Sequence, residues 1–401
     1  MCYDGEDTEA ELLTDRGLEK SMRIGIDLLW VRVGICGGTE SFIRNLLDGF
    51  QEHDRKNEYV LFVSEDNAAS FAHYEHNGRM RLYRCQVKSC SQPRRILWEN
   101  LYLDKAAARE KVDVMFIPVY SMPKTHRGGI PYVCTIHDLQ ALHYPQYFSA
   151  VRRLFLKRSW RYSCRAAKKI VTGSNYCKED LIRHYPEAKE KVTIIYDAVS
   201  TKQSVLSFAE PAARYGIEAE RYYYCVSSML PHKNLVTVLR AMWEIEKRRK
   251  AGEKSRNLVN KLVISGVGNQ QEAFEKMLAQ QGLEEIRDKI VLTGFVSDEE
   301  RDCLYENCKL FLFPSVFEGF GMPPIEAMRR GKRVVMTREA CLEEVTEGKA
   351  VYVEDPYDVK EWVEKIETAL TLAPGWVAFE KYELRNVVRE YLRVLGGWQD
   401  S

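Results

Sequence analysis

Short apolar segments alternate with amphipathic segments of helical length along the whole chain, and this alternation constrains the fold most strongly. Such short apolar runs, bounded by turn residues, predict buried strands. They span residues 23–28, 59–63, 114–117, 132–136, 170–172, 192–195, 222–226, 262–265, 290–292, 310–313, 333–336 and 350–353. Short apolar strands separated by helices are typical of parallel sheets covered on both faces. We therefore expect an α/β protein.

The chain is long enough for two such sheets. Its 401 residues exceed the size at which a single hydrophobic core stops growing, about 250–300 residues. Residues 201–220 are polar and contain Pro211 and Gly216, so we place the boundary between the sixth and seventh strands. This gives doubly wound, Rossmann-like domains over residues 22–199 and 200–375. The carboxyl ends of their strands would face each other across a cleft.

Composition limits the partners and the location of the protein. A net charge of +1 gives no overall attraction to nucleic acid, and we expect no such partner. The acidic segment 1–21, which we expect to be a flexible tail, lacks the apolar centre of a signal peptide. The eleven cysteines form no Cys-x-x-Cys pair, which favours reduced thiols and a cytoplasmic protein. We expect Cys134, Cys225, Cys303 and Cys308 to pack in the core.

The segment that follows the strand at 310–313 is the most informative about function. Residues 317–328 read FEGFGMPPIEAM, and Pro323 fits the first turn of a helix, where the missing N–H is not needed. Free amides and the dipole at a helix start attract an anion. Glu318 and Glu326 can accept hydrogen bonds from vicinal hydroxyls. An anion site beside two carboxylates predicts a nucleotide sugar; the alternative is a proline-initiated helix with two solvated glutamates.

This segment resembles the signature of the retaining glycosyltransferases of family 4, in which seven residues separate two glutamates. The resemblance implies a GT-B fold, with an acceptor-binding first domain, a donor-binding second domain, and a last helix within 376–401 that crosses back to the first. It implies that Glu326 holds the ribose hydroxyls and Glu318 the hexose hydroxyls. The donor would also contact the loop residues Gly319, Phe320, Gly321 and Met322.

Two segments of the first domain match the same family. The loop GICGGTE at residues 34–40 precedes a predicted helix, and paired glycines allow a phosphate to approach closely. By resemblance, Gly37 and Gly38 meet the donor diphosphate or the acceptor; the alternative is a plain turn. His137 and Asp138 end a predicted strand, as in family members that transfer mannose or related hexoses. There the histidine lines the donor sugar, so we predict His137 as a catalytic residue rather than a structural one.

The second domain offers a cation for the diphosphate. Lys233 stands where a loop meets a predicted helix, and an ammonium is a compact charge suited to phosphate; the alternative is a solvated lysine. The family commonly has glycine and arginine where this chain has Ser227 and Ser228. Ser228 is therefore a weaker match in the donor site, and the second phosphate-binding cation stays open, with His232 as one candidate. By resemblance, the backbone near Val296 reads the base, which leaves UDP, GDP and ADP open.

The chain contains no Asp-x-Asp, the metal clamp of the other major glycosyltransferase architecture. We therefore expect no metal ion and no cofactor, with Lys233, backbone amides and a helix dipole neutralising the diphosphate.

Residues 151–170 form a basic segment without an acidic residue. Eight cations occur in it, interleaved with Phe155 and Trp160, and such a helix can lie on anionic lipid. The cations appear all around the predicted helix, so their spacing gives no clean apolar face. Peripheral contact with the inner face of a membrane is one interpretation, and a solvated charged surface is the other.

The sequence thus predicts a cytoplasmic retaining glycosyltransferase. It would move a hexose, such as mannose, from a nucleoside diphosphate sugar to a glycan or lipid-linked acceptor in polysaccharide biosynthesis. Two alternatives remain: a non-catalytic subunit that binds nucleotide sugars, and another enzyme on this architecture, such as a nucleotide-sugar epimerase.

Overall fold

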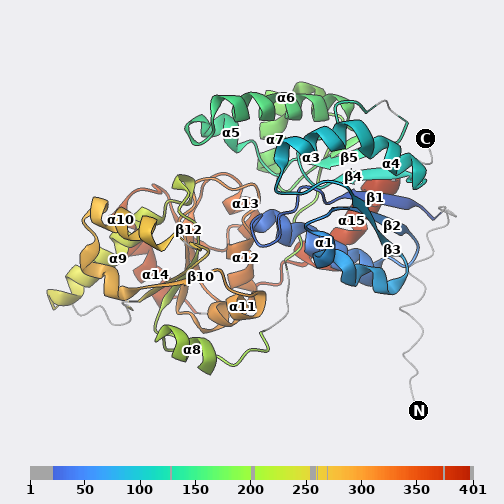
Figure 1. Cartoon of the computed structure of the whole chain (residues 1–401). Coiled ribbons are helices and arrows are strands. Elements are labelled where there is room, and N and C mark those ends of the chain that lie inside the picture. The colour runs from blue at the N-terminus through green and yellow to red at the C-terminus, as the bar shows by residue number, and fades with distance from the viewer. Residues whose placement is uncertain are drawn as a thin grey trace, which may run out of the picture.

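The computed structural model describes residues 21–126, 129–199, 204–252, 259, 261–268, 270–373 and 375–397, without the side chain of Asn77. It has two parallel sheets in two domains (Figure 1). The expected tail lies outside the described residues except for Ser21.

The first domain is built on a seven-stranded sheet with the order β3-β2-β1-β4-β5-β6-β7. Its strands are β1 (Arg23–Asp27), β2 (Glu58–Ser64), β3 (Met80–Cys85), β4 (Val114–Ile117), β5 (Tyr132–Thr135), β6 (Lys169–Thr172) and β7 (Val192–Ile194). Its helices are α1 (Gly38–His53), α2 (Ala68–Phe71), α3 (Gln92–Trp98), the π-helical turn η3 (Glu99–Leu103), α4 (Asp104–Arg109), α5 (Gln140–His143), α6 (Ala150–Ala166) and α7 (Asn175–His184). All neighbouring strands pair in parallel.

The second domain repeats this plan with six strands in the order β10-β9-β8-β11-β12-β13. They are β8 (Tyr223–Val226), β9 (Leu262–Ser265), β10 (Ile290–Gly294), β11 (Leu310–Phe313), β12 (Val334–Thr337) and β13 (Val351–Val353). The helices are α8 (Ala209–Tyr215), α9 (Leu235–Lys250), α10 (Gln271–Gln281), α11 (Asp298–Asn307), α12 (Met322–Arg329), α13 (Leu342–Thr346) and α14 (Val359–Thr371), and the last helix of the chain is α15 (Leu384–Gly396).

These sheets confirm the predicted fold class, and each of the twelve predicted strands is present with its ends within two residues of the prediction. The sequence analysis missed β3, which pairs only with β2 at the edge of the first sheet. Its sequence MRLYRC carries two arginines and only its ends are buried. An edge strand half exposed to solvent lacks the continuous apolar run that marks a central parallel strand.

Both faces of each sheet are covered by buried apolar residues. The predicted apolar stripe of α1, from Phe42 to Phe50, packs on the first sheet. The four cysteines expected in the core are buried, as predicted.

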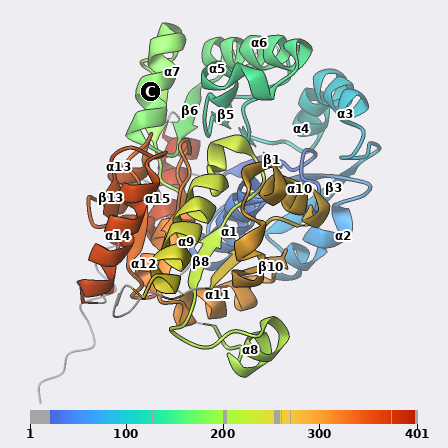
Figure 2. The same ribbon diagram turned by 90° about the vertical axis from the view of Figure 1, so that its left-hand side faces the viewer.

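The helix α6 differs from its sequence-based description. Its buried residues are Leu156, Ser159, Trp160, Ser163 and Cys164, so one face packs on the domain and the cations do not surround the helix. Most of them lie on the opposite face, which is exposed. Serine and cysteine complete the buried face, and neither counts as strongly apolar in a periodicity test. Figures 1 and 2 both show α6 at an outer edge of the first domain.

The last helix also begins later than expected. Among the described residues 376–397, only α15 is a helix of several turns, and it starts at Leu384 after a short 3-10 turn. Phe379 interrupts the preceding segment because its φ is 47°, a left-handed backbone conformation. Helix α15 packs against α1 of the first domain: a Cβ at Gly49 would lie 2.5 Å from Val388. In Figure 1 the red α15 lies among the blue elements.

The chain passes between the domains twice, and one arginine binds both passages. Arg329, at the end of α12, is 4% exposed. Its guanidinium donates to the carbonyl of Val199 in the first passage and to those of Ala378 and Phe379 in the second. Burial lowers the pKa of Arg329. This cation holds the two passages against the helix that carries Glu326.

Replacing Arg329 by Met should lower the free energy of unfolding by about 3 kcal/mol, because charged hydrogen bonds are lost and buried carbonyls keep no donor. Denaturant unfolding measures this change. The matched control is Arg389→Met on the exposed face of α15, which should change stability by less than about 0.5 kcal/mol. Equal effects of both variants would contradict this role for Arg329.

Candidate active site

The predicted donor loop leads from β11 into α12 at the interface of the two domains. Gly321 precedes the first turn of α12, has a φ of 88° and offers no side-chain cap. Pro323 and Pro324 stand in that turn, as predicted. The amides of Gly321 and Met322 precede the two prolines, and the positive end of the helix dipole lies at the same place. This helix start has the chemistry of an anion site.

Two residues predicted to hold different parts of the donor are in direct contact. Lys233 ends the 3-10 turn η6 (Pro231–Lys233) after β8. Its Nζ lies 2.6 Å from Oε1 of Glu318 in the β11–α12 loop. Both side chains are largely shielded, with 23% and 14% of their surface exposed. The ammonium and the carboxylate therefore neutralise each other.

The first domain contributes His137 and Asp138 to the same place. A Cβ at Gly319 would lie 2.3 Å from the carbonyl oxygen of His137 and 3.4 Å from Cβ of Asp138. Burial raises the pKa of Asp138; the charge of Glu318 raises it further and that of Lys233 lowers it. The structure thus brings Asp138 of the first domain close to Lys233 and Glu318 of the second, and it places the backbone of His137 against the same loop.

Two contacts position the His137 ring. Its Nε2 lies 3.1 Å from the carbonyl oxygen of Pro118. A carbonyl can only accept, so Nε2 donates this hydrogen bond. The edge-on contact with Phe42, at 4.8 Å between ring centroids, holds the ring against α1.

The glycine loop at residues 34–40 lies beside the donor loop. Gly37 is the N-cap of α1, with a φ of 56° and no side-chain cap. A Cβ at Gly38 would be 3.6 Å from Cε of Met322 in the second domain. One amide of this loop is already occupied: that of Gly34 donates to the carboxylate of Glu40 at 2.9 Å. The same carboxylate pairs with Arg44.

Glu326 has a separate set of partners. The hydroxyl of Tyr305 donates to its Oε2 at 2.9 Å, and a guanidinium nitrogen of Arg301 lies 3.6 Å from its Oε1. Both partners belong to α11. The N-cap of this helix is Ser297, which directly follows Val296. Sequence analysis missed Tyr305 and Arg301. Tyr305 and Glu326 are 21 positions apart in the sequence, and no local pattern marks a contact between such distant residues.

Burial argues against His232 as the second phosphate-binding cation. Burial, and then the neighbouring Lys233, lower the pKa of His232 to about 4. The ring is therefore neutral near pH 7. It packs beside Tyr144 and Tyr147, with centroid distances of 6.5 and 6.3 Å, which explains its loss of charge. The buried Oγ of Ser228 has no hydrogen-bond partner among the described residues, and the same holds for Nδ1 of His232.

A buried carboxyl lies behind His137. Asp197 follows β7 in the first passage between domains, and its Oδ1 would lie 3.8 Å from a Cβ at Gly173. Burial raises the pKa of Asp197 to about 6, with His137 acting in the opposite direction. Sequence analysis used this segment only as a domain boundary.

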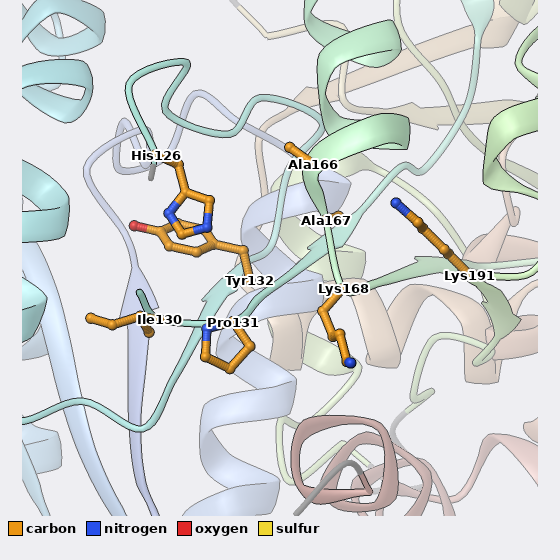
Figure 3. Close-up of a pocket in the computed structure, with 8 residues that line it drawn as sticks. All are labelled: His126, Ile130, Pro131, Tyr132, Ala166, Ala167, Lys168 and Lys191. Atoms are coloured by element: carbon orange, nitrogen blue, oxygen red, sulfur yellow. The ribbon is translucent and has the colours of Figure 1, made fainter. Parts of the chain in front are cut away.

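A pocket of about 440 Å³ lies elsewhere in the first domain, at the amino ends of β5 and β6 (Figure 3). His126 and Tyr132 line one part of it, and Lys168 and Lys191 another. Lys191 donates to the carbonyls of Cys164 and Arg165 at the end of α6, and His126 pairs with Asp104. Lys191 and His126 thus already have structural partners. The pocket is at the opposite end of the sheet from His137.

Two family models match consecutive parts of the chain: "Glycosyltransferase Family 4" over residues 36–203 and "Glycosyl transferases group 1" over residues 210–392. The chain belongs to this family of glycosyltransferases. The predicted resemblance and the GT-B architecture are confirmed. This glycosyltransferase has no helix, among its described residues, with the length and apolarity needed to cross a bilayer.

Named relatives include mannosyltransferases. O-antigen chain mannosyltransferase RfbU of Salmonella typhimurium is 26% identical over 264 residues, which are 66% of this chain and 68% of the relative. O-antigen chain mannosyltransferase B of Escherichia coli is 29% identical over 232 residues, 57% of this chain and 58% of the relative. Among solved structures, HepE of Anabaena in complex with UDP-glucose is 18% identical, with a TM-score of 0.66 over 94% of this chain and 100% of that chain.

Replacing Asp197 by Asn should stabilise this glycosyltransferase at pH 8 by up to about 3 kcal/mol. Because the folded-state pKa is raised, the folded protein keeps the proton between about pH 4 and 6, where the unfolded chain has lost it. Native stability attributable to Asp197 therefore falls as pH rises through this window, and asparagine removes that loss.

Denaturant unfolding of both proteins at pH 4 and pH 8 gives the comparison. Asp288→Asn, at a carboxylate with 66% of its side chain exposed, is the control and should show no gain at pH 8. If Asp197→Asn raised the free energy of unfolding equally at both pH values, the assignment would be contradicted.

Proposed function

We propose that this glycosyltransferase moves a hexose from a nucleoside diphosphate sugar to a glycan or lipid-linked acceptor, with retention and without a metal ion. The observation that carries the proposal is the meeting of His137 and Asp138 with Lys233 and Glu318 across the domain interface. A non-catalytic subunit has no need of this convergence. The similarity to O-antigen mannosyltransferases supports mannose as the hexose and polysaccharide biosynthesis as the setting.

In this proposal the nucleotide part of the donor binds the second domain, at the segments that follow β8, β10 and β11. Glu326 holds the ribose hydroxyls, and Tyr305 and Arg301 keep its carboxylate oriented. Val296, in the loop before α11, reads the base, and the buried hydroxyl of Ser228, which has no partner among the described residues, is free to bind a phosphate. HepE, a structural neighbour, was solved with UDP-glucose, which supports a nucleotide sugar in this architecture.

The diphosphate is the leaving group, and its charge must be stabilised as the sugar–phosphate bond stretches. Lys233 and the amides of Gly37, Gly38, Gly321 and Met322 supply this stabilisation where charge develops. The adjoining Gly319 and Phe320 bring the loop against the first domain. Because the configuration is retained, the acceptor attacks the face of the hexose from which the diphosphate departs, on the side of the first domain. The hexose lies between His137 and Glu318.

Replacing Glu326 by Ala should weaken donor binding by about 2 kcal/mol, because the charged hydrogen bonds to the ribose are lost. Thermal shift against UDP-, GDP- and ADP-sugars first identifies the donor, since a ligand that binds only the folded protein stabilises it. Calorimetry with that donor then compares the variants. Glu272→Ala on the exposed face of α10 is the control. Unchanged affinity in Glu326→Ala would remove the ribose assignment.

Activity should survive EDTA, because a lysine, amides and a helix dipole provide the positive charge that a metal would otherwise supply. The measurement is acceptor-dependent release of the nucleoside diphosphate, with and without chelator. Loss of turnover that returns on adding Mg²⁺ would overturn metal independence. Release that requires no acceptor and yields a changed sugar would identify an epimerase instead.

The exposed face of α6 supports peripheral binding to anionic membrane. Arg152, Lys157, Arg158 and Arg161 are exposed, and Val151 and Leu154 lie among them with 80% and 50% of their surface exposed. Beside this helix, η3 and the end of α3 expose Leu97, Leu101 and Tyr102. Lys124 joins the two elements, because its amide binds Asn100 of η3 and its Nζ lies 5.4 Å from the Phe155 ring of α6. Cations next to exposed apolar side chains suit a lipid surface.

Replacing these four cations of α6 by Gln should greatly reduce binding to vesicles that contain phosphatidylserine, because each cation near the surface contributes about 1 kcal/mol. Vesicle flotation measures the effect. The control replaces Lys247, Arg248, Arg249 and Lys250 at the end of α9 and should leave binding unchanged. A native protein that never binds such vesicles would end the membrane proposal.

A further inference from the structure

The contact between Lys233 and Glu318 conflicts with the roles that each has in donor binding. In the proposed function Lys233 meets the diphosphate and Glu318 meets the hexose. In the structure they meet each other at 2.6 Å, with most of both side chains shielded. Lys233 keeps two N–H donors and Glu318 a second oxygen, but each spends its charge on the other while the pair is intact.

The groups around the pair leave no surplus positive charge for an anion. Asp138 faces it from the first domain with a carboxyl. His232, next to Lys233, is neutral because burial lowers its pKa to about 4. The buried thiols of Cys225 and Cys341 also face the pair, and burial raises the pKa of each, so they add no cation. His143 has a carboxylate partner of its own, because its Nε2 lies 2.7 Å from Oδ2 of Asp180.

A bare nucleoside diphosphate therefore meets a cost at this site. It must take Lys233 from Glu318, which leaves a shielded carboxylate without its partner and close to the phosphate charges. A nucleotide sugar meets a smaller cost, because the hexose hydroxyls can donate to Glu318 as Lys233 turns to the diphosphate.

We propose that Glu318 makes the affinity for the diphosphate depend on the attached hexose. This inference rests on the proposed function and assigns Glu318 a second role, as a specificity determinant that discriminates between donor and product. Before the reaction it rejects the free nucleoside diphosphate. After the hexose has been transferred, Glu318 regains Lys233, the diphosphate loses its cation, and the product leaves.

The test is calorimetric binding of UDP, GDP, ADP and inorganic pyrophosphate to the native protein and to Glu318→Gln. Glutamine keeps the shape of the side chain and removes its charge, so Lys233 becomes available. Affinity for the nucleoside diphosphate of the matching base should rise about tenfold, the scale of one charge-assisted hydrogen bond. Affinity for the corresponding nucleotide sugar should stay the same or fall.

Two controls separate this effect from a general change of charge. Glu326→Gln removes the same charge from the same helix region but from a carboxylate that does not contact Lys233, and nucleoside diphosphate binding should weaken. In a Lys233→Met background, adding Glu318→Gln should give no gain. Glu318→Ala provides a second variant for the same comparison, and thermal unfolding without ligand shows that each protein is folded.

The inference is overturned if Glu318→Gln and Glu318→Ala bind the diphosphate no more tightly than the native protein, while the native protein binds a nucleotide sugar. It is also overturned if the gain persists without Lys233. If the native protein binds none of the nucleotide sugars, the proposed function fails as well, and the two failures are thus distinguishable.

Discussion

The absence of a side chain at Gly319 allows the two domains to meet at the candidate site. A single Cβ there would lie 2.3 Å from the carbonyl oxygen of His137, far closer than the van der Waals contact of about 3.5 Å. Donors at the start of α7 and at its N-cap, Ser174, close the junction. The hydroxyl of Ser174 donates to the carbonyl of Gly319 at 2.9 Å, and the thiol of Cys177 lies 3.1 and 3.2 Å from the carbonyl oxygens of His137 and Gly319. The loop that carries Glu318 is thereby placed beside the strand end that carries His137.

The same junction is fixed at two other points. Glu344 of α13 accepts from the first two amides of α7, those of Asn175 and Tyr176, at 2.7 and 3.1 Å, and from the hydroxyl of Tyr196. A carboxylate from the second domain thus satisfies amides at a helix start in the first. Arg329 binds the two chain passages on the other side. The conformation described here is therefore one in which the domains are in contact, and opening that separates α7 from α13 must break the hydrogen bonds of Glu344.

The fold could be predicted because its determinants are local. Apolar strands, amphipathic helices and their alternation appear along the sequence, and among the strands that the structure describes only the half-exposed edge strand β3 was missed. Parts of the site could be predicted for the same reason, since Glu318 and Glu326 share one loop and helix, and His137 and Lys233 each follow a strand.

What could not be predicted depends on contacts between distant segments. The partnership of Lys233 with Glu318 joins residues 85 positions apart, and that of Arg329 with Val199 joins residues 130 positions apart. The neutrality of His232 follows from burial beneath two tyrosines of the other domain, although its sequence position suggested a phosphate ligand. The charges of the side chains in this site depend on contacts across the domain interface, and no single segment of the sequence predicts them.

A crystal structure with the nucleotide sugar that most stabilises the protein would test the central claim most directly. The account predicts that Lys233 has left Glu318 and contacts the diphosphate beside the amides of Gly38, Gly321 and Met322. The hexose should lie between His137 and Glu318, and the ribose should lie on Glu326. A bound donor with the Lys233–Glu318 pair intact, or a diphosphate held by Lys168 and Lys191 at the far end of the first sheet, would contradict it.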